Sequence, residues 1–271
     1  AATEASSAGI NWTFAPMVDI ARDPRWGRIM EGAGEDPYLG SLFAAARVKG
    51  FQGNDLSADN TIVACAKHYA AYGAAEGGRD YNTVDISERT LRDVYLRPFK
   101  AAAEAGCGTF MNSFNEIGGI PSTGNSHLLR DILKCEWNFR GFVVSDWGSV
   151  GEMINHGVAA NKADAAALAA TAGCDMDMES RCYREELVNL VRQGKVDMKY
   201  IDDAVRRILR IKFQLGLFDD PYRYCNPERE KNLILHPDHL KAAKEMAIKS
   251  MVLLRNEGNI LPLKKSGQTI A

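Results

Sequence analysis

The stretch GFVVSDWG, residues 141–148, shows the pattern that decides the fold. A short apolar run ends at Ser145 and Asp146, and a helical pattern follows. The same order recurs along the chain, so that strand-like runs and helical patterns alternate five times. The polar side chains that come directly after these runs are Asp19; Lys67 and His68; Ser113 and Asn115; Asp146; and Asp175 and Asp177.

This alternation predicts an α/β fold with a parallel sheet. The predicted strands are apolar throughout, which is typical of strands that are covered on both faces. They span residues 10–18, 61–67, 108–113, 141–145 and 173–178. The predicted helices span residues 3–8, 37–50, 87–105, 125–137, 150–173 with an interruption near 155–157, 183–193, 198–215 and 237–254.

Two architectures fit this pattern, an open doubly wound sheet and a closed eight-stranded barrel. A dinucleotide-binding sheet would carry GxGxxG after its first strand, whereas the glycines of residues 22–36 lack that spacing. Polar residues gathered at the carboxyl ends of several strands are typical of barrels. We therefore favour a (β/α)8 TIM-barrel-like domain.

Five units do not close such a barrel, so we expect a barrel that is incomplete at its N-terminal units. Residues 1–219 are the predicted partial barrel, and residues 220–258 are an exit segment with a helix that packs on the barrel. Residues 259–271 are a predicted linker and the start of a second domain, in which Gln268 to Ala271 begin a strand.

The composition is that of an ordinary globular protein, with 46% hydrophobic residues and a formal net charge of −2 over 271 residues. No apolar run approaches the about 18 residues that a membrane helix needs, and the charge balance argues against nucleic-acid binding. The six cysteines lack CxxC spacing, which disfavours structural zinc and leaves disulfides and compartment open. Burial is expected for Cys65, Cys107 and Cys174.

Three segments carry the candidate chemistry: RDPRWGR at residues 22–28, the pair Lys67 and His68, and Asp146 with Trp147. Cleaving a glycosidic bond with retention needs a carboxylate close to the anomeric carbon. Cationic donors would hold the sugar hydroxyls, and an aromatic face would pack on the ring. Asp146 is therefore the candidate nucleophile, and Lys67 is the cation that would favour its charged form.

Each of these residues also has a purely structural interpretation. Asp146 would serve as a helix N-cap, and Lys67 and His68 as a surface pair or a core histidine. Arg28 would form an ion pair with Glu31 or Glu35, and Trp147 would simply pack. We expect Arg22 and Arg25 to be structural, and Asp36 to cap the helix that begins at Pro37. The lone DxD of residues 175–177 favours strand-end packing over a metal site, so no metal or cofactor is predicted.

Several long strings resemble glycoside hydrolase family three, most of all its bacterial periplasmic β-glucosidase branch, and they occur in the family's order. They are RDPRWGR and EGAGEDP (22–37), AKHYAAYGAAEGG (66–78), GFVVSDWG (141–148), AGCDMDM (172–178) and DDAVRRILRIKFQLGLFDDPY (202–222). The resemblance implies a barrel-like domain followed by an α/β sandwich domain. It also implies exo-acting, retaining hydrolysis of terminal β-linked glucosyl residues, without a cofactor, in the periplasm or outside the cell.

Residue by residue, the resemblance implies that Asp146 is the nucleophile and that Trp147 shapes the sugar site. Arg28, Lys67 and His68 would bind the glycone of an oligosaccharide or β-glucoside. A homodimer is left open. The resemblance places a sugar-binding Asp before Ala1 and the acid/base Glu beyond Ala271, and Glu76 and Glu116 are the alternatives within the chain.

Two positions depart from patterns of the family. Many members carry S-Y-N where this chain has Ser113-Phe114-Asn115, so the hydroxyl that would contact the nucleophile is absent. Tyr72 stands where the N-acetylglucosaminidase branch has a second histidine, which disfavours that branch.

Three other functions stay open at this point. One is a non-catalytic carbohydrate-binding protein on a hydrolase scaffold, which the presence of all the expected site residues argues against. A β-xylosidase of the same family is another. The last is a cofactor-dependent α/β enzyme, which the lack of a phosphate-binding glycine loop disfavours.

Overall fold

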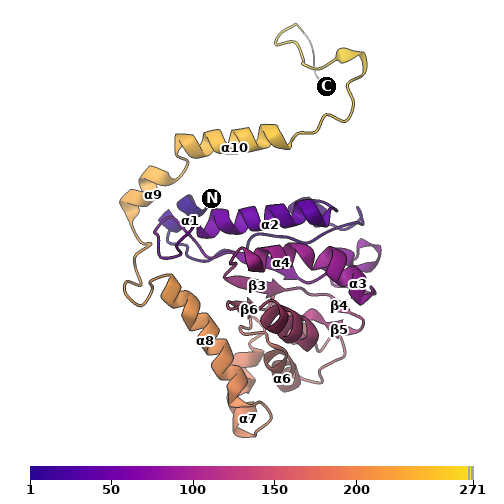
Figure 1. The fold of residues 1–271 in the computed structure, drawn as a ribbon, viewed down its shortest axis with the longest axis vertical. Coiled ribbons are helices and arrows are strands. Elements are labelled where there is room, and N and C mark those ends of the chain that lie inside the picture. The colour runs from indigo at the N-terminus through magenta and orange to yellow at the C-terminus, as the bar shows by residue number, and fades with distance from the viewer. Residues whose placement is uncertain (268, 270–271) are drawn as a thin grey trace.

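The computed structural model describes residues 1–267 and 269. Helices and strands alternate along most of the chain, and helices surround a central parallel sheet (Figure 1). The predicted α/β class is confirmed. The strand expected from Gln268 to Ala271 falls outside the described residues, except for Thr269.

The central sheet has the strand order β1-β3-β6, with both pairs parallel. Its strands are β1 (Cys65–Tyr69), β3 (Thr109–Asn112) and β6 (Phe142–Val144). Thr109 lies opposite Cys65 on one side and opposite Phe142 on the other, so the first residues of the three strands are aligned. They therefore end at one edge of the sheet.

Two further segments extend this sheet without forming regular strands. Residues 10–18 run beside β1, where the Val18 N–H donates to the Lys67 carbonyl at 2.8 Å. Met176 makes a parallel bridge to Val144 at the other side. The prediction of five regular strands is thus wrong for the first and the last. In the first, Pro16 has no N–H to contribute to a continuous ladder.

Both faces of the sheet are buried, as the apolar strands predicted. One face meets the large core, which contains Ala66 of β1 and Ala64 just before it. The other face meets a smaller cluster that contains Cys65, Met111 and Val144. Cys65, Cys107 and Cys174 are buried free thiols, as expected.

Helices α2 (Pro37–Gln52) and α4 (Arg97–Glu104) lie side by side over the sheet (Figure 1). The Asp36 carboxylate accepts the Tyr38 N–H at 2.9 Å, which confirms the predicted cap of α2. The single helix predicted over residues 87–105 is wrong. It is divided into α3 (Glu88–Thr90), the π-helical segment η4 (Leu91–Tyr95) and α4, because Pro98 lacks the N–H that a continuous helix needs.

The remaining helices follow the predicted order with adjusted ends. Asn161 caps α6 with its side chain, after the predicted interruption. A second small sheet, β2-β4-β5, was not predicted, because strands of two residues leave no periodic pattern. The other elements are α1 (Ala2–Ser7), η1 (Ile29–Glu31), η2 (Tyr72–Ala74), η3 (Glu76–Gly78), β2 (Thr83–Val84), β4 (Glu116–Ile117), β5 (Ile120–Pro121), η5 (Ser122–Gly124), the π-helix η6 (His127–Glu136), α5 (Ser149–Glu152), α6 (Lys162–Ala172), α7 (Cys182–Arg192), α8 (Met198–Gln214), α9 (Pro227–Leu233), α10 (Pro237–Ser250) and η7 (Glu257–Asn259).

The C-terminal helices α9 and α10 extend away from the strands (Figure 1). Arg229 of α9 donates to the Ser6 hydroxyl at 3.1 Å, and His239 of α10 lies 3.1 Å from Glu4. No residue of α10 is buried. The division at residues 219 and 258 stays a prediction. Within the described part of the chain, every helix is too short or too polar to span a bilayer.

The close approach of β3 and β6 yields a prediction about Gly141. A Cβ atom there would overlap the Gly108 carbonyl oxygen and lie 2.6 Å from Phe139 Cζ. We expect Gly141→Ala to lower the free energy of unfolding by about 1–3 kcal/mol in urea denaturation. Gly50→Ala is the control, because its Cβ would meet no atom within 4 Å and the residue lies in helix α2. Equal stability of the two variants would contradict the steric argument.

Candidate active site

Asp146 lies two residues after the end of strand β6 at Val144, and the residue is 8% exposed. Its Oδ1 accepts the Trp147 N–H at 2.7 Å. The N-cap of helix α5 is Gly148, which has a φ of 72°, so the expected alternative of Asp146 as the N-cap does not hold. The Ser145 hydroxyl accepts the Met178 N–H at 2.7 Å and fixes the end of the strand.

Two opposing effects act on the pKa of Asp146. Burial raises the pKa of its carboxyl, because the charged form loses its hydration. The Trp147 N–H and nearby basic side chains lower that pKa in turn. These side chains are His68, Lys67 and Arg28. The sequence prediction that a cation such as Lys67 favours the charged form of Asp146 agrees with this balance.

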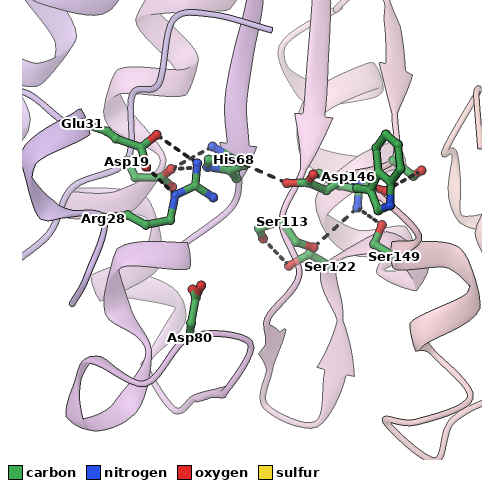
Figure 2. A network of polar contacts seen from close by, with 12 residues as sticks. Asp19, Arg28, Glu31, His68, Asp80, Ser113, Ser122, Asp146 and Ser149 are labelled. Carbon is green, nitrogen blue, oxygen red and sulfur yellow. Dashed lines mark hydrogen bonds and ion pairs between the residues drawn. The ribbon is translucent and has the colours of Figure 1, made fainter. Parts of the chain in front are cut away.

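His68 lies at the end of β1, between two carboxylates (Figure 2). Its Nδ1 is 2.8 Å from Asp19 Oδ2, and its Nε2 is 3.6 Å from Asp146 Oδ2. The side chains of His68 and Asp19 are each 1% exposed. His68 is thus buried, as the core alternative expected, but it is also part of the group around Asp146.

Lys67 precedes His68 in β1 and is partly exposed. Its charge lowers the pKa of Asp146 and also that of Glu31, after the larger effect of Arg28 on Glu31. Among the interactions of the described residues, no hydrogen bond or ion pair of the Lys67 ammonium occurs. The ammonium can therefore bind a ligand hydroxyl without breaking a contact within the chain.

Arg28 forms a two-point ion pair with Glu31, with Nε–Oε1 at 2.6 Å and Nη2–Oε2 at 2.9 Å (Figure 2). The structural interpretation is thus correct for Glu31. The guanidinium also lies 5.5 Å from the centre of the Tyr72 ring, and its charge acts on Asp146. Pairing with Glu31 and acting on Asp146 are compatible, because the ion pair holds the Arg28 guanidinium in place near the other charged side chains.

An aromatic cluster borders this group. The Tyr72 ring packs edge-on against His68 at 5.1 Å and against Trp26 at 5.3 Å. The centre of the Phe114 ring lies 4.3 Å from the centre of the Tyr81 ring. The Tyr72 hydroxyl is buried without a hydrogen-bond partner in the described part of the chain.

Three further residues at this site were missed in the sequence. Burial raises the pKa of Glu152, and the charge of Asp146 adds to that effect. Burial likewise raises the pKa of Tyr81, with smaller effects from Glu152, Asp80 and Asp146. The three are Glu152, Tyr81 and Asp80, and only the position of the last two, directly after the string at residues 66–78, could have drawn attention to them.

A network of hydrogen bonds between polar side chains lies next to Asp146. The Asn112 amide donates to the Thr123 hydroxyl at 2.5 Å, and that hydroxyl donates to Ser149 at 3.0 Å. Ser113 donates to Ser122 at 3.0 Å (Figure 2). These bonds connect the end of β3 to segment η5 and helix α5, so they fix the backbone next to Asp146.

Asp175 and Asp177 are engaged in packing, as predicted. Asp175 forms a buried ion pair with Lys134 at 2.6 Å and accepts the Val143 N–H at 2.8 Å. Asp177 accepts the Tyr183 N–H at 3.1 Å near the start of α7. In residues 1–267 and 269, no cluster of three or more His, Cys, Asp or Glu is arranged to hold a metal ion.

The structure therefore brings together Asp146, His68, Lys67 and Arg28. Trp147 is next to Asp146 in the chain, and the residue is 63% exposed, so packing in the core is not its role. Arg25 forms an exposed ion pair with Asp23 at 2.7 Å, as expected of a structural residue. A buried carboxylate beside several basic groups and an aromatic cluster is suited to bind and attack a polyhydroxylated ring.

Comparisons with known proteins agree with this chemistry. Residues 1–211 match the family model "Glycosyl hydrolase family 3 N terminal domain". A periplasmic beta-glucosidase of Salmonella typhimurium is 46% identical over 100% of this chain and 36% of its own length. A beta-xylosidase of Formosa agariphila is 39% identical over 98% of this chain and 38% of its own length.

Solved structures are similar as well. The beta-glucosidase from Listeria innocua in complex with glucose superposes with a TM-score of 0.93 and 45% identity, over 97% of this chain and 36% of that one. The barrel-like α/β fold is thereby confirmed at the level of the domain. The chain spans between 36% and 38% of the length of these relatives.

The Lys134–Asp175 pair yields a prediction about stability. Burial lowers the pKa of Lys134 and raises that of Asp175, so each charge depends on its partner. We expect Asp175→Asn to cost about 3 kcal/mol in urea denaturation, because it leaves the buried ammonium with only its longer ion pair to Asp203 at 3.8 Å. The double variant Lys134→Met/Asp175→Leu should recover most of that loss.

The exposed pair Lys162–Glu185 is the matched control, since its groups stay in water. Glu185→Gln should leave the unfolding curve nearly unchanged. A cost for Asp175→Asn as small as that of the control would show that the buried pair does not hold this edge of the sheet.

Proposed function

The chain belongs to glycosyl hydrolase family 3, and we propose that it forms the nucleophile-bearing part of an exo-acting, retaining β-glycosidase. The substrate would be an oligosaccharide or β-glucoside with a terminal β-linked glucosyl residue. The observation that carries the proposal is the placement of Asp146, a nearly buried carboxylate at a strand end with His68, Lys67 and Arg28 around it.

In the first step, a carboxylate oxygen of Asp146 attacks C1 of the sugar. A bond forms between C1 and this oxygen, and the bond from C1 to the leaving oxygen breaks. In the second step, water attacks C1 and gives a proton to the group that protonated the leaving oxygen, the Asp146–C1 bond breaks, and the net configuration is retained. Because burial weakens hydration of the carboxylate, less solvent has to be displaced before attack.

The basic groups would bind the sugar so that its C1 lies next to the Asp146 carboxylate. The Lys67 ammonium and the Arg28 guanidinium are donors only, so each would bind hydroxyl oxygens. The Tyr72 hydroxyl is buried near Asp80 and Arg28 but makes no hydrogen bond among the described residues, which supports the presence of a polar ligand nearby. Trp147, with its exposed indole, would pack on the sugar or on the leaving group.

The leaving oxygen needs a proton from a second group, which adds about 10²–10⁴-fold to the rate. We propose that this group is a glutamate of a further domain, as the resemblance implies, and not Glu76 or Glu116. The partition into a barrel over 1–219, an exit segment and a linker belongs to the same proposal. A homodimer stays open.

Both glucose and xylose are compatible with the relatives, since a periplasmic beta-glucosidase and a beta-xylosidase match the chain over nearly its full length. We propose glucosides first, because identity to the beta-glucosidase is 46% against 39%. The name of the Salmonella relative supports a periplasmic or extracellular location.

The nucleophile assignment is tested with a chromogenic aryl β-glucoside and the full-length gene product. Asp146→Ala should lower kcat/KM by about 10³-fold or more. Asp164→Ala, at an exposed carboxylate of α6, is the control and should retain activity. In the parent protein, a 2-fluoro glucoside should label Asp146 covalently, as detected by peptide mass spectrometry. An active Asp146→Ala variant, or a label elsewhere, would refute the assignment.

Lys67 generates a prediction about pH dependence. Burial raises the pKa of Asp146, and the charge of Lys67 lowers it. Removing that charge in Lys67→Met raises the pKa of Asp146 further, so the carboxylate ionises only at higher pH. We therefore expect the acid limb of the kcat/KM profile to move to higher pH, and Lys100→Met, on the exposed side of α4, to leave it in place. A limb that stays or moves to lower pH would contradict this coupling.

A further inference from the structure

We propose that His68 is a doubly protonated imidazolium held between Asp19 and Asp146, and that Asp19 is the positioning residue that maintains this state. The inference deepens the proposed function and rests on Asp146 being the attacking group. Asp19 comes directly after residues 10–18, the irregular segment that runs beside β1. Its side chain points toward His68 of β1 (Figure 2).

The first observation is that one carboxylate oxygen receives two N–H groups of the same residue. Asp19 Oδ2 accepts the His68 backbone N–H at 2.9 Å and lies 2.8 Å from His68 Nδ1. A charged carboxylate only accepts hydrogen bonds, so Nδ1 must carry a proton. This arrangement fixes both the tautomer and the orientation of the ring.

The second observation concerns the other ring nitrogen. His68 Nε2 lies 3.6 Å from Asp146 Oδ2. In a neutral ring with its proton on Nδ1, Nε2 would present a lone pair to a carboxylate oxygen in a buried site. A proton on Nε2 turns this repulsion into an ion pair. Since 3.6 Å is longer than a hydrogen bond, Nε2–H would also remain available to a sugar hydroxyl.

The third observation is the balance of charge around the ring. Asp19 Oδ1 is buried and accepts no hydrogen bond among the described residues, so no donor other than His68 neutralises this carboxylate. Glu31 adds a further negative charge, which interacts electrostatically with Lys67 and His68. The carboxylates of this group outnumber its permanent cations, and an imidazolium offsets the difference.

Every charged or titratable group that faces this ring or its partners enters this balance. From the 10–31 segment come Asp19, Arg28 and Glu31, and from β1 and the turn after it come Lys67 and Tyr72. From the 79–82 loop come Asp80, which accepts the Trp26 indole N–H at 3.4 Å, and Tyr81, and from β6 and α5 come Asp146 and Glu152.

The consequence for the reaction is electrostatic. An imidazolium beside Asp146 favours the charged carboxylate that attacks C1, and it keeps its proton through both steps. No proton moves through His68. Asp19 acts on the reaction only through the ring, and its substitution should therefore change the proton count of His68 before it changes the shape of the site.

The test uses Asp19→Asn in the full-length gene product. The amide oxygen of Asn can still accept both N–H groups, but the negative charge that favours a second ring proton is lost. After labelling with [15N]histidine, and with His68→Gln to assign the signal, the parent should show two protonated ring nitrogens at pH 7. The variant should show one protonated and one bare nitrogen.

A kinetic measurement follows the same charge. With a 2,4-dinitrophenyl β-glucoside the leaving group needs no proton, so the alkaline limb of kcat/KM reports on the Asp19–His68–Asp146 group and not on the general acid. Asp19→Asn should move this limb to lower pH and reduce kcat/KM about 10-fold, the difference between a charge-assisted and a neutral hydrogen bond. Asp23→Asn removes a partly exposed carboxylate, paired with Arg25, from the same segment and should change neither.

A bare ring nitrogen on His68 in the parent at pH 7 would overturn the proposal, since the ring would then be a neutral imidazole. An Asp19→Asn variant with both ring protons and an unchanged pH profile would overturn the role of Asp19. The parent spectrum needs no variant at position 19, so misfolding of Asp19→Asn leaves the first test intact. If the protein hydrolysed no glycoside, the proposed function would fail, while the histidine spectrum would still decide this inference.

Discussion

The rest of the site depends on the protonation balance of Asp146. Its carboxyl is nearly buried, which favours the neutral form, but it lies beside basic groups, which favour the charged form. Burial alone would favour the neutral acid of Asp146, and a neutral acid is a poor nucleophile. The Trp147 N–H and the charges of His68, Lys67 and Arg28 act against burial. These groups come from distant parts of the chain, so the balance exists only in the folded protein.

The parallel sheet makes this convergence possible. Strands β1, β3 and β6 run in one direction, with a single register shift between Lys67 and Tyr69, so the residues after them meet at one edge. The polar side chains at that edge must find partners, because an unpaired polar group away from water is costly. Asn112, Thr123 and Ser149 bond to one another, whereas Asp19 Oδ1 and the Tyr72 hydroxyl keep unused capacity within the described residues. That distribution is typical of a site shaped for a polar ligand.

Sequence patterns found the residues that follow regular apolar runs, because such runs have a clear period and a clear end. Lys67, His68 and Asp146 were predicted in this way. Patterns failed where the backbone is irregular: the two bridge segments at the sides of the sheet, the π-helical turn before Pro98, and the strands of two residues. Asp19 was noticed as a polar residue after a run, but its contact with His68 spans 49 positions and leaves no local signal.

The sequence by itself determined the α/β class, the order of the elements and the burial of the strands on both faces, and it singled out Asp146 as the candidate carboxylate. Each of these follows from local composition and period, or from strings that resemble a family. The tertiary structure alone decided which basic groups face Asp146, that Glu31 rather than Glu35 pairs with Arg28, and that Asp175 binds Lys134. The physical reason is that charges interact through space, and the distance between two charges is set by packing and not by their separation along the chain.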